Sequence, residues 1–146
     1  MNFGISLVAL VVVEIAFANV EQFHGRWQGE AIRVGQSSET CPFTITIAYD
    51  GDHRSLQIFH KLGCSYPEIW TETAHISDHS LYYRFWDEDL SLMRQVSIGY
   101  WSKSSIHINW RHYSEANYTL SEHRLDYRKS LLDGSFFITG SLFRTD

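Results

Sequence analysis

Short segments of alternating apolar and polar residues follow one another along almost the whole chain, and this pattern most constrains the fold. Turn-forming residues separate the segments at intervals of about eight to twelve residues, which is typical of all-β proteins. No stretch after residue 20 shows helical periodicity. The pattern predicts strands near residues 26–34, 42–49, 54–61, 68–76, 80–86, 92–100, 105–113, 118–128 and 135–143.

The alternation keeps one phase within most segments. Ile106, Ile108 and Trp110 share one face of their segment, opposite His107 and Asn109. Each strand therefore has an apolar side and a wet side, as expected for antiparallel strands around an interior. Short connections favour a meander, and closure into a barrel removes exposed strand edges. We expect an all-β, antiparallel up-and-down meander barrel.

The first eighteen residues have the features of a secretory signal peptide. Residues 5–13 form an apolar run too short to span a bilayer, and Ala16 and Ala18 precede Asn19 as in a cleavage site. We expect a signal peptide over residues 1–18, one domain over residues 19–146, and a secreted or periplasmic protein. A buried N-terminal helix is the alternative. No other segment approaches transmembrane length, so no membrane span is expected.

Export to an oxidising compartment changes how the two cysteines are interpreted. Cys41 and Cys64 form an even pair without a Cys-x-x-Cys motif, which favours a disulfide over a metal or redox site. The net charge of −5 is mild and the basic residues form no run. Nucleic acid is therefore not an expected partner, because nothing would neutralise a row of phosphates.

Gly25-Arg26-Trp27 opens the first predicted strand, and Arg144 lies near the end of the last one. This combination resembles the signature of the calycin group, which includes lipocalins and fatty-acid-binding proteins. The resemblance implies that Trp27 packs across the closed end of a barrel. It also implies that Arg144 covers Trp27 and bonds to the backbone of the entering turn, residues 21–24. The central-loop motifs of lipocalins are absent, and an ordinary core role for Trp27 is the alternative.

An up-and-down barrel that brings both chain ends to one side needs an even number of strands, whereas the alternation gives nine. The inconsistency lies in residues 118–128, where Tyr118 and Leu120 occupy even positions but Leu125 and Tyr127 occupy odd ones. Such a change in the phase of the alternation requires either a β-bulge or a reversal of the chain direction. A reversal gives ten strands and an overcounted edge strand gives eight, so we expect eight to ten.

The expected meander places the loops near residues 35–41, 62–67, 87–91 and 114–117 at the open end. The polar residues on the inward phase are the candidate ligand-binding residues: His60, Glu72, Tyr83, Arg94 and His112. Of these, His60, Arg94 and His112 are expected toward the mouth, where they could hold the polar head of an apolar ligand. The alternative is that they are strand-end residues whose polar heads reach water.

Catalytic motifs are missing from the sequence: it has no Gly-x-Ser-x-Gly, no phosphate-binding loop and no cysteine beyond the pair. Eight histidines are many, but none forms His-x-His, the spacing that places two rings on one face of a strand. A haem-binding barrel related to nitrobindin would need one His ligand, and none can be assigned. We expect no enzyme activity, no metal and no cofactor.

The favoured function is secreted, non-catalytic binding of a small apolar or amphipathic molecule inside the barrel. The alternative is an interaction or inhibitor-type protein whose barrel is filled by its own aromatic side chains. Tyr82, Arg84 and Trp86 on the wet phase would then contact the partner, because exposed aromatics and Arg dominate protein interfaces. Residues 87–89 form an acidic turn, and residues 117–119 are a lone N-glycosylation sequon.

Overall fold

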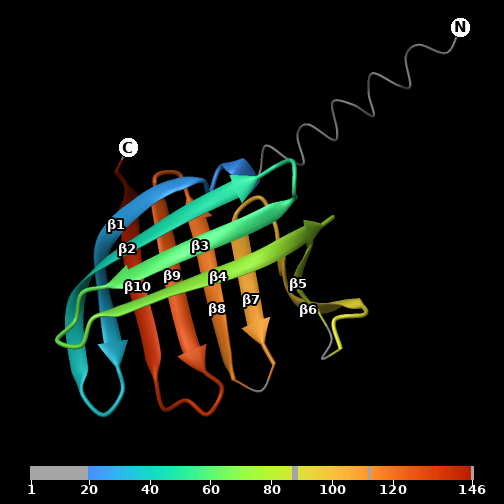
Figure 1. Cartoon of the computed structure of the whole chain (residues 1–146). Coiled ribbons are helices and arrows are strands. Elements are labelled where there is room, and N and C mark those ends of the chain that lie inside the picture. Colours follow the sequence, from blue (N-terminus) through green and yellow to red (C-terminus); the bar gives the residue numbers. More distant parts are fainter. Residues whose placement is uncertain (1–19, 87–88, 112, 146) are drawn as a thin grey trace, which may run out of the picture.

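The computed structural model describes residues 20–86, 89–111 and 113–145, so the expected signal peptide lies outside the described residues. The described residues form ten antiparallel strands in a meander, and the sheet closes into a barrel because β1 pairs with β10 (Figure 1). The strands are β1 (Gly25–Val34), β2 (Ser38–Asp50), β3 (Ser55–Leu62), β4 (Glu68–Ser77), β5 (Ser80–Trp86), β6 (Met93–Trp101), β7 (Ser105–Trp110), β8 (Ser114–Ser121), β9 (Arg124–Leu131) and β10 (Phe137–Arg144). The expected all-β meander barrel is confirmed. The described part of the chain contains no helix of the length and apolarity that a membrane span needs.

The tenth strand comes from a reversal within the segment whose phase flips. β8 ends at Ser121 and β9 begins at Arg124, and Glu122 between them adopts a φ of 48°. Tyr118 and Tyr127 thereby become cross-strand partners, and both are buried. The change of phase therefore marks a tight turn rather than a bulge.

The turn between β7 and β8 lies earlier than the sequence predicted. The expected strand 105–113 ends at Trp110, and the Tyr113 N–H donates to the Trp110 carbonyl at 3.0 Å. The expected loop at residues 114–117 is instead the start of β8, in which Ser114 and Ala116 are buried. This expectation was wrong because small and polar residues look like a turn, whereas here the inward ones fill a narrow part of the barrel.

The segment that precedes β1 plugs one end of the barrel. Val20 and Phe23 are buried there, and the Phe23 N–H donates to the Val20 carbonyl at 3.1 Å. Gly25 then turns the chain into β1 with a φ of 132°, a conformation that strains residues with a side chain. The glycine of the Gly-x-Trp pattern is thus required by the backbone.

Trp27 and Arg144 tie this plug to the first and last strands. They are cross-strand partners in the pairing of β1 with β10. The Trp27 indole N–H donates to the Phe23 carbonyl at 3.0 Å, and the Arg144 guanidinium carbon lies 4.4 Å from the centroid of the Trp27 ring. Arg144 also donates to the carbonyls of Gln22 and His24, each at 2.6 Å. The closed end is therefore held by buried aromatic surface, a cation–π contact and hydrogen bonds.

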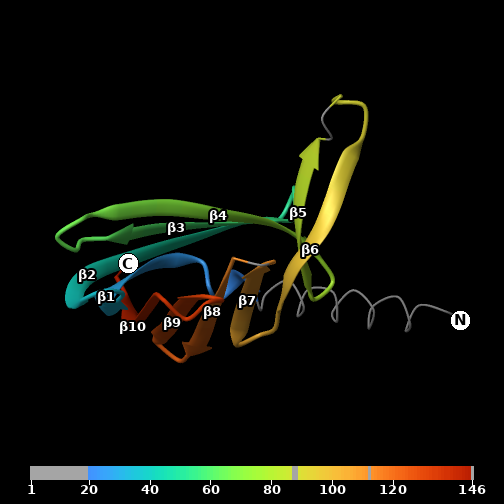
Figure 2. The same ribbon diagram turned by 90° about the horizontal axis from the view of Figure 1, so that it is seen from below.

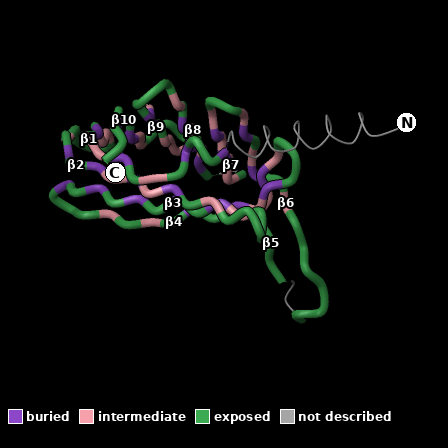
Figure 3. The backbone as a smooth tube through the Cα atoms, turned by 90° about the horizontal axis from the view of Figure 1, so that it is seen from above, coloured by how far each residue is buried: buried purple, intermediate pink, exposed green. Residues whose placement is uncertain are grey.

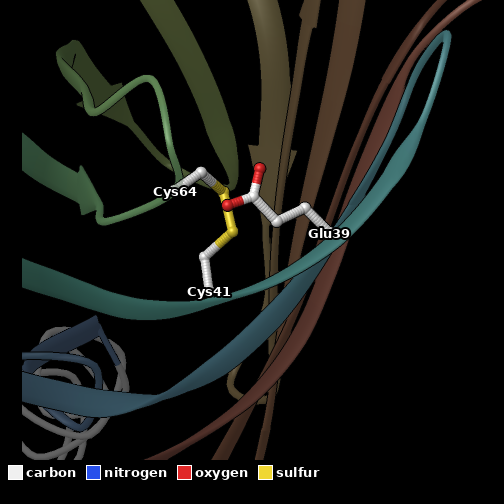
Figure 4. A group of neighbouring side chains, drawn as sticks. All are labelled: Glu39, Cys41 and Cys64. Carbon is white, nitrogen blue, oxygen red and sulfur yellow. A yellow bond between two sulfur atoms is a disulfide. The ribbon is translucent and has the colours of Figure 1, made fainter.

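A disulfide joins Cys41 of β2 to Cys64 after β3, at the open end of the barrel, as expected (Figure 4). The two Cα atoms are 4.9 Å apart. Glu39 lies beside the disulfide and accepts hydrogen bonds from the Ser65 N–H and hydroxyl at 2.7 and 2.8 Å. The sulfur atoms near Glu39 are in a disulfide rather than thiolates, so this group is a cross-link and not a metal centre.

The outer half of the β5–β6 hairpin leaves the barrel. β5 pairs with β4 only through residues 80–82, and β6 pairs with β7 only through residues 99–101. The register between β5 and β6 shifts between Leu81 and Tyr82. Beyond this irregularity the two strands pair only with each other and extend away from the barrel, with most of their surface exposed (Figures 2 and 3).

Removing the Trp27 side chain should strongly destabilise the fold. We expect Trp27→Ala to lower the free energy of unfolding by about 3–5 kcal/mol, because it creates a cavity and leaves Arg144 without its ring partner. Urea denaturation followed by circular dichroism measures this change. The control is Phe143→Ala, an aromatic residue on the neighbouring strand β10 that is 56% exposed, and it should cost less than about 0.5 kcal/mol. Equal effects of the two substitutions would contradict the role given to Trp27.

Candidate functional site

An opening in the barrel wall lies where the hairpin departs. β4 has no strand beside residues 68–74 on the side away from β3, because its pairing with β5 is confined to residues 75–77. An open pocket of about 340 Å³ lies at this opening. Its lining residues come from four strands and one turn: Trp70, Thr71, Glu72, Trp110, Tyr113, Ser114 and Lys129. The pocket is the point at which interior side chains meet solvent.

The pleat of each strand brings these side chains together. Trp70 and Glu72 occupy alternate positions of β4, on the phase that continues to buried Ala74. Lys129 follows buried Tyr127 on the inward phase of β9. Trp110 ends the run of inward residues on β7. The pocket therefore combines two indole rings with one carboxyl and one ammonium group.

A chain of short hydrogen bonds runs from the pocket into the barrel. The Tyr118 hydroxyl lies 2.8 Å from Glu72 Oε2 and 2.8 Å from His60 Nε2. His60 Nδ1 lies 3.2 Å from the Trp70 carbonyl oxygen. His60 and Tyr118 are fully buried and Glu72 is 5% exposed, so these groups have little access to water.

The positions of the protons in this chain follow from its partners. The Trp70 carbonyl can only accept, so His60 carries its proton on Nδ1 and donates it there. His60 Nε2 is then an acceptor for the Tyr118 hydroxyl. The Tyr118 hydroxyl donates to Glu72 Oε2 when that carboxyl is ionised, but its one proton can go to His60 Nε2 instead when the Glu72 carboxyl is protonated and donates to Tyr118. One neutral arrangement thus satisfies every contact in the chain.

The ionisation of the buried groups agrees with this arrangement. Burial lowers the pKa of His60 from 6.5 to about 3, so its imidazole is neutral. Burial also raises the pKa of the Glu72 carboxyl, although the Tyr118 hydroxyl and the Lys129 ammonium oppose this shift. The pKa of Tyr118 is raised by burial and by the charge of Glu72.

Aromatic packing holds the hydrogen-bonded side chains in place. The rings of His60 and Trp70 stack with their centroids 4.4 Å apart and an angle of 4° between their planes. Phe43 stacks beside Trp70 at 6.0 Å, and Tyr127 lies 5.0 Å from Tyr118. The Lys129 ammonium lies 4.9 Å from the centroid of the Trp70 ring. These contacts form a rigid floor beneath the pocket.

Two side chains of the pocket have polar atoms without a hydrogen-bond partner. They are Oε1 of Glu72 and Nε1 of Trp70, both buried. The Lys129 ammonium is 3.8 Å from Glu72 Oε1, which is an ion pair when the carboxyl is ionised but is too long for a hydrogen bond. Buried polar atoms are usually paired, so these two atoms are available to a water molecule or a ligand in the pocket.

The structure does not gather the predicted ligand-binding residues into one mouth. His60 and Glu72 lie inside the barrel, as their inward phase indicated. Tyr83 is 42% exposed on the projecting hairpin, where its ring meets the edge of Trp110 at 5.5 Å. Arg94 is exposed on β6 rather than inward-facing, because the hairpin leaves the barrel before this position. His112 lies outside the described residues.

Sequence reasoning missed Trp70, Trp110 and Lys129 as pocket residues. Trp110 had been assigned to the inward face, but as a core residue rather than a lining residue. Lys129 lies one residue beyond the strand predicted to end at residue 128, although it continues the odd phase of Leu125 and Tyr127. Extending that phase by one step would have placed Lys129 inside the barrel.

Comparisons with known proteins identify the fold but no family. No protein-family model matches the chain, and no curated protein matches it. Among solved structures, the chain is similar to a crystal structure of a DUF3598-family protein of unknown function from Nostoc punctiforme, with 14% identity and a TM-score of 0.57. The match covers 86% of this chain and 49% of that one, so the chain spans about half the length of its neighbour. At this identity the likeness shows the fold alone.

The buried His60 should make the protein sensitive to acid. Below about pH 6.5 the His60 imidazole becomes protonated in the unfolded chain but stays neutral in the folded chain, because its pKa is lower there. The free energy of unfolding therefore falls as the pH falls. Between about pH 7.5 and about pH 5 this residue should remove about 2 kcal/mol of stability. The measurement is the free energy of unfolding across this range for the unsubstituted chain and for His60→Gln, which should lose that part of the pH dependence.

The control for this measurement is His53→Gln. His53 is exposed, and its pKa is raised by the hydrogen bond that its ring N–H donates to the Asp50 carboxylate, so its contribution has the opposite sign. A His60→Gln variant with the pH dependence of the unsubstituted chain would show that the imidazole is not held neutral in the barrel.

Proposed function

We propose that this protein binds a small amphipathic molecule in the side pocket and does no chemistry on it. The observation that carries the proposal is the pocket itself: about 340 Å³, two indole rings, and two buried polar atoms that lack a partner. Ligand sites commonly combine an apolar lining with a few fixed polar groups. The sequence lacks the usual catalytic motifs, which favours binding over catalysis.

The polar groups define what the ligand must offer. The Lys129 ammonium and the Trp70 N–H are donors, so they favour a ligand with an acceptor oxygen. The free Oε1 of Glu72 is an acceptor, because the carboxyl proton, when present, lies on Oε2 toward Tyr118. The apolar part of the ligand would lie against Trp110 and Tyr113 at the rim. A flat or short apolar body with one polar end fits these requirements.

The protein is further proposed to act outside the cytoplasm. The Cys41–Cys64 disulfide is compatible with an oxidising compartment, and the leader has the pattern of a signal peptide. The resemblance of Gly25, Trp27 and Arg144 to the calycin signature agrees with a ligand-binding barrel. The contacts of Trp27 and Arg144 at the closed end are those that this resemblance implies.

A second candidate function is protein interaction through the projecting hairpin. The barrel interior is occupied by aromatic side chains such as Trp27, Phe43 and Tyr127, which favours this alternative. Arg84 and Trp86 are exposed on the hairpin and Tyr82 is half-buried. A protein that retains no small molecule but holds a protein partner through these residues would fit this alternative rather than the first.

Binding of the amphipathic fluorophore 8-anilinonaphthalene-1-sulfonate tests the pocket. We expect enhanced emission on addition of the folded protein, because the rings of the dye enter the apolar lining and its sulfonate reaches Lys129. Lys129→Met should weaken binding about tenfold or more, the effect of losing one charge-assisted hydrogen bond. Trp110→Ala should weaken it as well, through lost apolar contact.

Lys103→Met and Trp86→Ala are the matched controls, because both side chains are exposed and neither lines the pocket. Each should leave the affinity for the dye unchanged. Near-ultraviolet circular dichroism establishes that every variant keeps its tertiary packing. Equal affinities for the Lys129 and Lys103 variants would remove the pocket from consideration.

A further inference from the structure

One edge of β4 has no neighbouring strand along most of its length. β4 pairs with β3 along residues 68–75, but its other edge has a strand beside it only at residues 75–77. The unpaired part includes Ile69, which is 63% exposed, and Thr71 and Thr73, all of which favour extended chain. Exposed edges of this kind template the addition of another strand.

The projecting part of the β5–β6 hairpin also has strand edges without a neighbour. Residues 83–86 of β5 and residues 93–96 of β6 pair with each other, and neither strand has a neighbour on its outer side. Most large apolar side chains of this hairpin are exposed, among them Tyr83, Phe85, Trp86, Leu90, Leu92 and Met93. A monomer thus presents exposed apolar side chains and two strand edges without a neighbouring strand on one arm, and Figure 3 shows that most of this arm is exposed.

We propose that a second copy of this chain fills both surfaces, so that the hairpin of each copy lies along the free edge of β4 in the other. Every copy carries one free strand edge and one projecting hairpin. Two copies related by a two-fold axis would therefore satisfy both features at once and leave neither open. A different protein that covered the hairpin would still leave the β4 edge unpaired.

The apolar area is adequate for such a dimer. The six exposed apolar side chains of the hairpin offer roughly 500 Å² per copy, the greater part of the about 800 Å² that each partner buries in a standard interface. Backbone pairing along β4 and contact with Ile69 would add the remainder.

The strand directions fix where the tip of the hairpin comes to lie. If β5 of the second copy runs antiparallel to β4, as β5 does within one chain, its tip reaches the Glu68 end of β4. Exposed Arg111, between β7 and β8, lies at that end of the barrel. The tip carries Asp89 within the acidic sequence of residues 87–89. The tip of the second copy therefore comes to the end of the barrel that carries both Arg111 and Glu68.

Sedimentation equilibrium of the disulfide-bonded protein tests the proposal. We expect a mass of two chains, with a dissociation constant of about 10 µM or tighter. Trp86→Lys on the hairpin and Ile69→Lys on the β4 edge should each raise this constant at least about tenfold, because each buries a charge in the interface. Both side chains are exposed within one chain, so neither substitution should unfold it.

Phe143→Lys is the matched control: an exposed aromatic on β10, away from both surfaces, whose replacement should leave the dimer intact. A chain that stays monomeric at about 100 µM, ten times the expected dissociation constant, would overturn the proposal. So would a dimer that Trp86→Lys dissociates and Ile69→Lys does not, because the hairpins would then pack on each other. The result of the fluorophore experiment on the side pocket is independent of this test, since neither Trp86 nor Ile69 lines that pocket.

Discussion

A short seam, where β5 pairs with β4 and β6 pairs with β7, determines which surfaces this molecule exposes. β5 and β6 join the wall through only three residue pairs on each side, and the register shift beside Leu81 turns the rest of the hairpin outward. Gly99 permits the close approach at this seam, because a Cβ there would collide with the His107 carbonyl. The pocket, the free edge of β4 and the exposed hairpin all follow from this one departure.

The polar cluster beneath the opening is stable because its groups satisfy one another. His60, Tyr118 and Glu72 would each be costly to bury alone, but together they form a chain of hydrogen bonds that ends on a backbone carbonyl. The aromatic stack around His60 and Trp70 excludes water from this chain. Within the described residues, the buried atoms of this cluster that lack partners are the Tyr127 hydroxyl and, on the side chains that line the pocket, Glu72 Oε1 and Trp70 Nε1.

The sequence pattern predicted the barrel well and the site poorly, for a physical reason. Alternation reports which side of a strand is apolar, and closure follows from the need to bury that side; the flip between Tyr118 and Tyr127 even located the extra turn. Alternation does not report where a strand leaves its neighbours. Leu81, Tyr83 and Phe85 keep a regular phase, yet only Leu81 is inside the barrel. Arg94, assigned to the same inward phase, is exposed for the same reason.

The central claim is that the side pocket holds a small molecule, and native mass spectrometry of the protein purified from its own source tests it most directly. We predict a retained small-molecule mass on the unsubstituted chain, and its loss when Trp110→Ala is produced and purified in the same way. A spectrum that contains only the bare polypeptide, or a retained mass that is unaffected by the substitution at Trp110, would contradict the account.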